Sequence, residues 1–293
     1  MGRTHSAGRF WKAGSVNSPI PKTTVEQADD VCALPLARRM AALLDRDPAS
    51  LQYGDPLPRG WHAALFNPPT RQSDLRHDGA AYLGVTLPDL GMPRLMMAGR
   101  RIDFSGDIPI GASVSRMSQP GLVTYKTGRS GRFALVDVEH RITVEGDEKP
   151  AVIETNSYVL REAANGGPAN LSSTEPLPIP PADVMRTFVP DETTLFRYSA
   201  ITDNPHRIHY DLAYARSEGY PALVVNGTVP TMFLLEMFRA HVGGEPAGWL
   251  SRNLAPIFCG TSLTLTLTRD EDAWTMRAYG PLGEVALEAK AWA

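Results

Sequence analysis

Side chains that can exchange protons are concentrated in one short segment of the chain. Between positions 203 and 211 there are two histidines, two aspartates, an asparagine and an arginine, more than a turn that only caps helices would use. Histidine suits proton transfer because its ordinary pKa is close to neutrality. His209 and His206 are therefore the first candidates for acid–base chemistry.

The elements that must position this segment follow two similar plans. In the first half, Thr23 or Thr24 can cap a helix that starts near Val25. From Arg100 the period of the apolar residues changes to two, which predicts about five antiparallel strands up to Leu160.

The second half has a related order of elements. Its pattern predicts a strand near 195–198, a polar loop over 202–211 and a helix over about Pro230–His241. Alternating residues then predict three more strands, near 263–267, 274–278 and 285–291. Each half also has a proline-to-glycine signature before a strand, over 109–113 and 256–262, which hints at a duplicated unit.

One helix wrapped by a long antiparallel sheet, used twice, predicts an α+β fold of the double hotdog type. Two unrelated α+β domains are the alternative. We expect a mobile arm over 1–24, an N-terminal hotdog over 25–161, a Pro- and Gly-rich linker over 162–183 and a C-terminal hotdog over 184–293. Two hotdogs in one chain can pair their sheets internally, and a homodimer is also compatible with this arrangement.

The composition argues against several classes of protein. The net charge of −3 gives no sign of a nucleic-acid partner, and no apolar run of about 18 residues could form a membrane helix. Cys32 and Cys259 lack metal or redox spacing, so we expect no metal site, no disulfide and a cytoplasmic location. The mitochondrial matrix is the alternative, because residues 1–25 contain basic but no acidic residues.

Part of the polar segment resembles a known family motif. The run from His209 through Asp211 and Tyr214 to Ala215 is similar, without a gap, to the second half of the motif of MaoC-like acyl-CoA hydratases and dehydratases, which have a hotdog fold. In that family the catalytic aspartate lies five residues before the histidine, where this chain has Asn204. The resemblance implies a hydro-lyase with one site per chain, because the N-terminal half has no equivalent motif.

The longer pattern resembles one branch of this family. Residues 199–211 are similar to the segment of mesaconyl-CoA (methylfumaryl-CoA) hydratases and mitochondrial-type hydroxyacyl-thioester dehydratases. The Lys126–Gly131 hairpin and the stretch Leu57–His62 also resemble that branch, so the resemblance covers nearly the whole chain after about residue 25. Two residues depart from the branch. Asp203 replaces an apolar residue, and Asn226 replaces a histidine that commonly precedes the glycine.

This resemblance implies roles for three residues in adding water to an α,β-unsaturated thioester. The reaction needs a base for the water, an acid for Cα and donors for the enolate-like thioester oxygen. His209 suits the base, and Asn204 cannot accept a proton but can orient the water. Gly227 corresponds to the family's backbone donor for the thioester oxygen, at a helix start whose potential is positive.

Four further residues are expected to contact the substrate. They are Asp203, His206, Arg207 and Asn226. Arg207 could pair with a CoA phosphate or a substrate carboxylate, and a surface ion pair is the alternative. His206 could instead be a hydrogen-bonded loop residue, and Asp211 is expected to be a cap or brace. CoA enters as part of the acyl-CoA substrate, so no metal or redox cofactor is implied.

The implied substrate is a short branched or dicarboxylic enoyl-CoA such as mesaconyl-CoA. Two other functions stay open. A hotdog thioesterase usually has a carboxylate on the central helix, so Glu236 or Asp203 beside His209 would favour that activity. The substitutions at Asn204 and Asn226 motivate a third function, a non-catalytic or catalytically redirected module that binds acyl thioesters.

Overall fold

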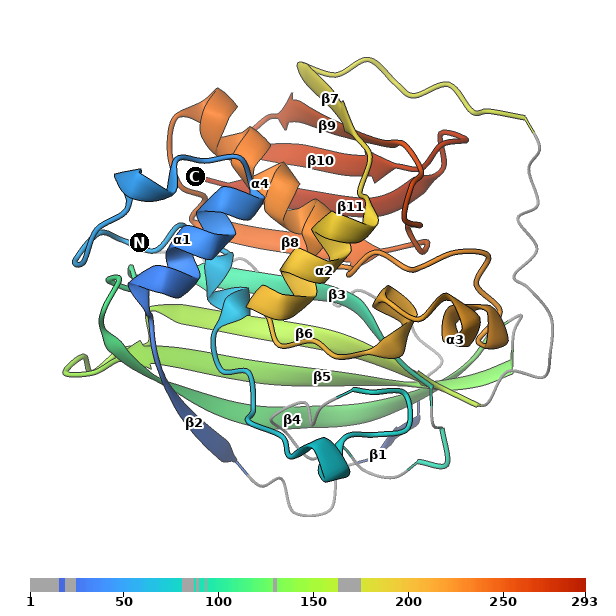
Figure 1. Ribbon diagram of the computed structural model, residues 1–293, viewed down its shortest axis with the longest axis horizontal. Coiled ribbons are helices and arrows are strands. Elements are labelled where there is room, and N and C mark those ends of the chain that lie inside the picture. Colours follow the sequence, from blue (N-terminus) through green and yellow to red (C-terminus); the bar gives the residue numbers. More distant parts are fainter. Residues whose placement is uncertain are drawn as a thin grey trace.

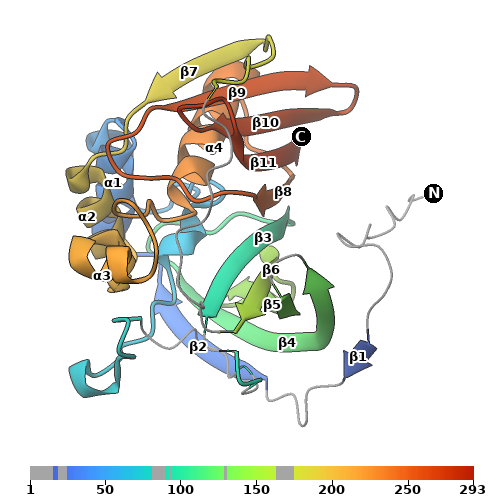
Figure 2. The same ribbon diagram turned by 90° about the vertical axis from the view of Figure 1, so that its right-hand side faces the viewer.

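The strands of the protein form one continuous antiparallel sheet. The computed structural model describes the backbone of 16–18 and residues 25–80, 87, 90–92, 94–128, 131–162 and 175–293. The strand order is β1-β4-β5-β6-β3-β8-β11-β10-β9-β7, with β2 paired to β4. The two halves of the chain occupy the two ends of the sheet and the helices lie on one face of it (Figures 1 and 2). The α+β class is confirmed.

The N-terminal half contributes strands β1 to β6 and one α-helix to the described structure. Its strands are β1 (Val16–Ser18), β2 (Glu26–Val31), β3 (Arg94–Phe104), β4 (Ser113–Gly128), β5 (Gly131–Val144) and β6 (Val152–Arg161). Its helix is α1 (Leu34–Leu43), followed by the 3₁₀ turns η1 (Pro48–Ser50), η2 (Trp61–Ala64) and η3 (Gln72–Asp74). Gly128 pairs with Gly131, as the expected hairpin requires, and its two tip residues lie outside the described residues.

The C-terminal half contains a longer helix and five strands. The strands are β7 (Val184–Phe188), β8 (Gly248–Asn253), β9 (Leu263–Asp270), β10 (Ala273–Tyr279) and β11 (Val285–Trp292). The helices are α2 (Glu192–Ile201), the 3₁₀ turn η4 (Arg207–His209), α3 (Leu212–Ser217) and α4 (Val229–Val242). The predictions of a helix over about 230–241 and of the last three strands are confirmed.

The two halves join edge to edge through β3 and β8. These strands pair antiparallel from Gly99↔Arg252 to Asp103↔Gly248. A Cβ atom at Gly99 would collide with the Ser251 carbonyl oxygen, so a glycine is required where the two backbones approach. The expected internal pairing of two sheets is therefore present, and it covers one edge of each half.

The order of elements is repeated in the two halves. Gly111 and Gly260 of the proline-to-glycine signatures both have positive φ, and their N–H groups donate to the carbonyls of Cys32 and Pro190, just before α1 and α2. Each half also has an isolated β-bridge to its signature. Pro56 bridges to Pro109 and lies five positions before η2 (61 − 56), and Val224 bridges to Phe258 and lies five positions before α4 (229 − 224). The four-residue turn η2 thus stands where the other half has the 14-residue helix α4.

Helix α4 forms the centre of the C-terminal half. Pro230 suits the first turn of a helix because it has no N–H to satisfy, and Gly243 ends the helix with φ of 78°. The side chains that pack under the sheet are completely or almost completely buried, among them Met232, Leu234, Leu235, Met237 and Phe238. Within the described residues no helix is long and apolar enough to cross a membrane.

The helix expected near Val25 is wrong at its start. Residues 26–31 form strand β2, which pairs with β4 from Glu26↔Ser118 to Val31↔Ser113, and the helix begins only at Leu34. The burial of β2 alternates residue by residue, with Asp30 on the inner side accepting the N–H of Phe66 at 2.6 Å. Pairing with β4 therefore outweighed the capping potential of the preceding threonines.

The strand expected near 195–198 is also wrong, because this segment lies in α2. Asp191 is the N-cap, and its Oδ1 accepts the N–H of Thr194 at 2.8 Å. A capping aspartate satisfies a free donor of the first turn and favours a helix despite the following threonines and aromatics. Strand β1 falls within the expected arm, and the rest of 1–24 and most of the expected linker lie outside the described residues.

Candidate active site

The polar loop over 202–211, called the histidine loop below, begins where α2 ends. Asp203 has φ of 43°, in the left-handed region, and the N–H of Asn204 donates to the Ser199 carbonyl at 2.9 Å. This is a Schellman helix end, in which one left-handed residue reverses the chain. Asp203 is exposed there, so its position is explained by the turn that it makes.

Two bonds from side chain to backbone shape the rest of the loop. Asn204 Oδ1 accepts the N–H of His206 at 3.2 Å, and His206 Nδ1 accepts the N–H of Ile208 at 3.3 Å. Short polar side chains favour turns through such local bonds. Asn204 therefore helps to place both histidines through its oxygen.

His209 lies at the end of η4 with its ring buried and its tautomer fixed. Its Nδ1 is 2.7 Å from the carbonyl oxygen of Val224, which can only accept, so Nδ1 carries the hydrogen and Nε2 keeps a lone pair. Burial lowers the pKa of His209 to about 4, against the raising effect of the bond to Val224 and with a smaller lowering by His206. The ring is thus neutral near pH 7, and Nε2 can accept a proton.

His206 lies beside His209 and faces a carboxylate from the other half of the chain. The two rings have centroids 5.8 Å apart, and His206 Nε2 is 3.7 Å from Asp78 Oδ2. Burial lowers the pKa of His206, and Asp78 offsets this in part. A Cβ atom at Gly79 would collide with the Pro205 carbonyl, so the 76–80 turn packs tightly on the loop. Asp78 is buried but had no motif that could have predicted its place here.

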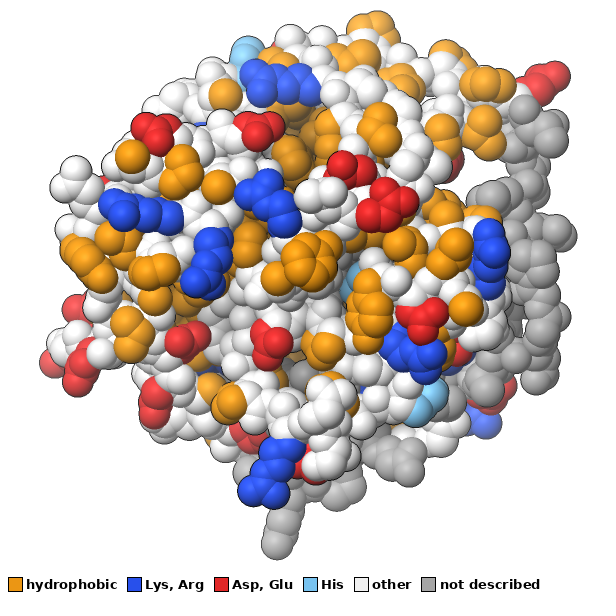
Figure 3. Space-filling view, viewed as in Figure 1, with side chains coloured by type: hydrophobic (Ala, Val, Ile, Leu, Met, Phe, Trp, Pro, Cys, Tyr) orange, Lys and Arg blue, Asp and Glu red, His pale blue; other side chains and the backbone are white. Residues whose placement is uncertain are grey.

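Arg207 is occupied by an ion pair on the surface of the loop. Its Nε and Nη2 atoms lie 3.1 and 2.7 Å from Asp211 Oδ2, and its guanidinium carbon lies 4.3 Å from the ring centroid of Tyr214. Asp211 Oδ1 caps α3 by accepting the N–H of Tyr214 at 3.0 Å. This geometry matches the surface ion pair that was the alternative for Arg207, and the cap expected of Asp211. Acidic and basic side chains are interspersed over this face of the molecule (Figure 3).

The start of α4 presents free donors next to a buried amide. Within the described residues, the N–H groups of Gly227 and Thr228 have no hydrogen-bond partner. Asn226 is 3% exposed, yet neither its Nδ2 nor its Oδ1 has a partner among those residues. A Cβ atom at Gly227 would meet Asn253 only at an ordinary 3.5 Å, so packing inside the chain does not demand a glycine. These donors fit an anionic oxygen approaching the helix start.

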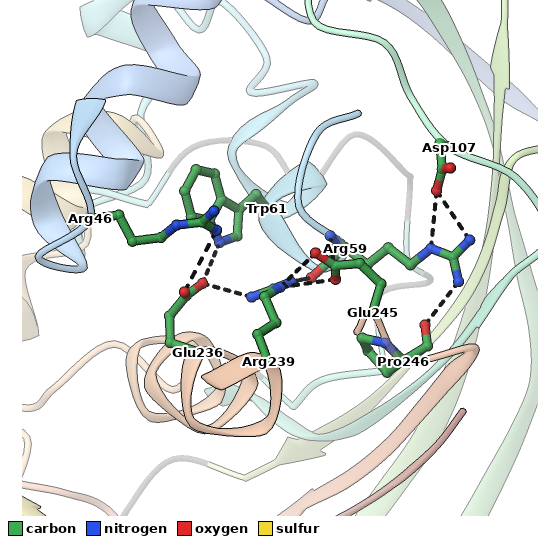
Figure 4. Close-up of polar contacts among 8 residues, drawn as sticks. All are labelled: Arg46, Arg59, Trp61, Asp107, Glu236, Arg239, Glu245 and Pro246. Carbon is green, nitrogen blue, oxygen red and sulfur yellow. Dashed lines mark hydrogen bonds and ion pairs between the residues drawn. The ribbon is translucent and has the colours of Figure 1, made fainter. Parts of the chain in front are cut away.

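Glu236, the carboxylate of the thioesterase alternative, is engaged in a network with Trp61 and two arginines (Figure 4). It accepts Trp61 Nε1 at 3.2 Å and pairs with Arg239 at 2.6 Å and with Arg46 at 3.7 Å. Arg239 continues the network to Glu245 and to the carbonyl of Arg59. The network fixes η2 against α4. Among the described residues, no hydrogen bond or ion pair joins His209 to Glu236 or to the exposed Asp203.

A polar cavity of about 120 Å³ lies between the start of α4 and the N-terminal half of the chain. Its lining residues are His62, Ala63, Leu65, Phe66, Arg100, Arg116, His140, Ile142, Glu154, Asn156 and Thr228. Thr228 Oγ1 accepts from Arg100 Nη2 at 3.4 Å, so the residue after Gly227 connects the cavity to the candidate donors. No site residue had been predicted in this half.

A signal for this cavity was present in the strand pattern. In β6, Glu154 and Asn156 share the inward face with Val152 and Tyr158, since residues two apart point to the same side. Arg100 in β3 and His140 in β5 likewise occupy buried, inward-facing positions of their strands among apolar residues. Charged residues at inward positions are expensive unless paired or functional, which makes such interruptions worth noting.

The model of the family hydroxyacyl-thioester dehydratase type 2 matches residues 60–259, more than half of the chain. The chain belongs to the hydroxyacyl-thioester dehydratase type 2 family. It is also 37% identical, over 91% of its length and 94% of the relative's, to mesaconyl-C(4)-CoA hydratase of Chloroflexus aurantiacus. As a member of this family the chain is a hydro-lyase, and the resemblance stated from its motifs is confirmed.

Solved structures of other proteins share the fold of this hydroxyacyl-thioester dehydratase family member. A MaoC-like dehydratase of Phytophthora capsici superposes with a TM-score of 0.68 at 12% identity, covering 92% of this chain and 95% of that one. A Mycobacterium tuberculosis protein described as having a double hotdog fold gives 0.59 at 13% identity, covering 93% and 96%. The double hotdog fold predicted from the sequence is confirmed.

Proposed function

We propose that the protein adds water to, or removes it from, a short branched or dicarboxylic enoyl-CoA thioester such as mesaconyl-CoA. In hydration, His209 Nε2 takes a proton from water as the oxygen attacks Cβ. The electron pair moves through Cα to the thioester oxygen. The protonated ring then returns a proton to Cα, which closes the balance of atoms and charge. The reaction needs neither an electron acceptor nor a metal.

The observation that carries this proposal is the bond between His209 and the Val224 carbonyl. It gives the ring one tautomer, with the free lone pair on Nε2, and burial keeps that ring neutral near pH 7. A neutral histidine with its other nitrogen fixed has the form that general-base catalysis requires. His209 is also the histidine of the family motif.

The start of α4 supports the second part of the mechanism. The unbonded N–H groups of Gly227 and Thr228, at the positive end of a 14-residue helix, would bind the thioester oxygen as charge develops on it. Fixed donors of this kind act most strongly where water is excluded. A thioester lying against the backbone would explain the glycine, since neighbouring protein atoms do not require it.

The other polar residues would orient the reactants. With its oxygen bonded to the N–H of His206, Asn204 would present its amide nitrogen to the attacking water. Asn226 would donate to or accept from the substrate, because its buried amide lacks a partner among the described residues. His206 would border the site, and Arg207 at its rim could exchange Asp211 for a CoA phosphate, whereas the exposed Asp203 serves the turn.

The substrate class is supported by the relative from Chloroflexus aurantiacus, whose name states that it hydrates mesaconyl-C(4)-CoA. The test is a panel of crotonyl-, mesaconyl-, itaconyl- and longer enoyl-CoA thioesters, followed by loss of the conjugated thioester absorbance. We expect rapid loss for one member of the short, branched or dicarboxylic group. His209→Ala should lower kcat at least about 100-fold.

The control is His241→Ala, which removes an exposed histidine at the far end of α4. It should keep the turnover of the unchanged protein. Full activity in His209→Ala would refute the assignment of the base. Release of free CoA thiol, without hydration, would instead identify a thioesterase, and binding without either signal would identify a non-catalytic module.

A further inference from the structure

The inner face of the N-terminal sheet carries a row of polar groups across three strands. Glu154 of β6 is opposite His140 of β5, which is opposite Ser118 of β4. Ser118 Oγ lies 2.9 Å from His140 Nδ1, and all three residues are at most 6% exposed. In the other half, the corresponding inner face is covered by α4. Because η2 has only four residues, His140 and Glu154 of this row instead line the 120 Å³ cavity.

One acidic group in the cavity is already fully engaged. Glu154 Oε2 lies 3.0 Å from His62 Nε2, and Oε1 lies 3.5 Å from Arg100 Nη1. Burial raises the pKa of Glu154, but Arg100 and the bond with His62 outweigh it, so that the pKa is lowered and the group is ionised. Glu154 therefore balances one positive charge and holds Arg100 in place.

A second positive charge in the cavity has no ion pair among the described residues. Arg116 also lines it, with its guanidinium carbon 5.0 Å from the Phe66 ring centroid. The lining holds two arginines against one glutamate, and burial lowers the pKa of Arg116 although Glu154 and, from outside the lining, Asp30 offset this in part. Among the described residues, Arg116 Nε is a buried atom without a hydrogen-bond partner, and Arg100 Nη1 has only its 3.5 Å ion pair with Glu154. Unsatisfied charged donors are costly and point to a missing anionic partner.

The position of the cavity relates this anion to the substrate. Arg100 Nη2 contacts Thr228 Oγ1, and Thr228 follows Gly227, where the thioester oxygen would bind. A short acyl group anchored at these backbone donors could reach Arg100 and Arg116 with its far end. We propose that the cavity binds a carboxylate at the far end of the acyl chain, so that the substrate is a monothioester of an unsaturated dicarboxylic acid. This inference rests on the function proposed above.

In this arrangement Arg100 and Arg116 bind the carboxylate, and Glu154 and His62 are positioning residues. A guanidinium forks onto a carboxylate through two parallel bonds, which an alkyl chain cannot replace. A long apolar acyl chain would bury its methylenes against unpaired charge, which disfavours it. Within the described residues no group of three His, Cys, Asp or Glu side chains could hold a metal ion.

The first test uses two pairs of thioesters that differ by the carboxylate. Fumaryl-CoA and crotonyl-CoA measure turnover, and fumarate is symmetric, so the position of CoA raises no ambiguity. Succinyl-CoA and butyryl-CoA measure binding by calorimetry, because neither has a double bond to hydrate. We expect succinyl-CoA to bind at least about 10-fold more tightly than butyryl-CoA.

The variant is Arg116→Met, which keeps an apolar side chain against Phe66 without the charge. It should reduce the fumaryl-to-crotonyl ratio of kcat/KM by about 10- to 100-fold and bring the two binding constants to within about threefold. Arg116→Lys should retain part of the preference. The control is Arg141→Met, an exposed arginine on β5 that pairs with Glu139, and it should leave both ratios unchanged.

Equal binding of succinyl- and butyryl-CoA to the unchanged protein would overturn the carboxylate site. Equal losses for both members of a pair in Arg116→Met, with Arg116→Lys no better, would overturn it as well. If hydration is observed without a preference for the carboxylate, this inference fails alone. If no thioester is hydrated but succinyl-CoA binds in an Arg116-dependent way, the proposed function fails and the carboxylate site stands.

Discussion

Two buried histidines should make the stability of this protein fall steeply in mild acid. Burial lowers the pKa of His209 and of His140 from the ordinary 6.5 to about 4. Around His140, the charges of Arg116, Arg100 and His62 lower the pKa further, and Glu154 opposes them. Because both pKa values are lower in the folded chain, their contribution to stability is complete above pH 6.5. It is lost as the pH falls toward 4.

The size of the effect follows from these pKa values. Between about pH 7 and pH 5 the unfolded chain takes up most of one proton per histidine while the folded chain takes up almost none. At about 1.4 kcal/mol per pH unit and proton, each histidine removes about 2 kcal/mol from the free energy of unfolding. The two together remove about 4 kcal/mol, a large share of the stability of an ordinary domain.

Urea unfolding at several pH values measures this loss directly. In His140→Gln, where glutamine can still bond Ser118, the fall between about pH 7 and pH 5 should shrink by about 2 kcal/mol. His209→Gln should show the same reduction. If both buried-site variants lose as much stability as the unchanged protein, the reasoning about burial is refuted. Activity per folded molecule should stay level to about pH 5, since His209 remains neutral.

Three substitutions test other features. Gly227→Ala should fold normally, since its Cβ would lie 3.5 Å from Asn253, but should lower kcat at least about 100-fold; an unchanged kcat would argue against the backbone donor. Glu154→Leu should lower the urea midpoint by the equivalent of about 3 to 5 kcal/mol at constant m, because it leaves Arg100 buried and unpaired. Asp203→Gly should raise the free energy of unfolding by about 0.5 to 1 kcal/mol, seen as a slightly higher melting temperature, with no loss of turnover. A loss of turnover would return Asp203 to the site.

Local patterns were sufficient for much of the fold. The alternation of apolar residues predicted the long strands, and Pro230 predicted the start of the central helix. Both depend on interactions within a few residues, which the sequence states directly. The two wrong elements have different causes. Near Val25, pairing of residues 26–31 with the distant strand β4 decided against a helix. At 195–198, the local cap at Asp191 decided for a helix, and the prediction overlooked that signal.

The candidate site divides in the same way. The sequence by itself determined the histidine loop, because Asn204, His206 and His209 shape one another through bonds that span two or three residues. It could not determine which nitrogen of His209 is free, since that depends on the Val224 carbonyl 15 residues away.

Only the tertiary structure decided that a charged cavity lies beside α4. Arg100 and Glu154 are 54 positions apart (154 − 100), and Thr228 is 128 positions beyond Arg100. The sequence tells which residues of a strand share a face. Which face becomes the interior, and which charges then meet there, depends on strand register and on the short turn η2 that leaves the space open.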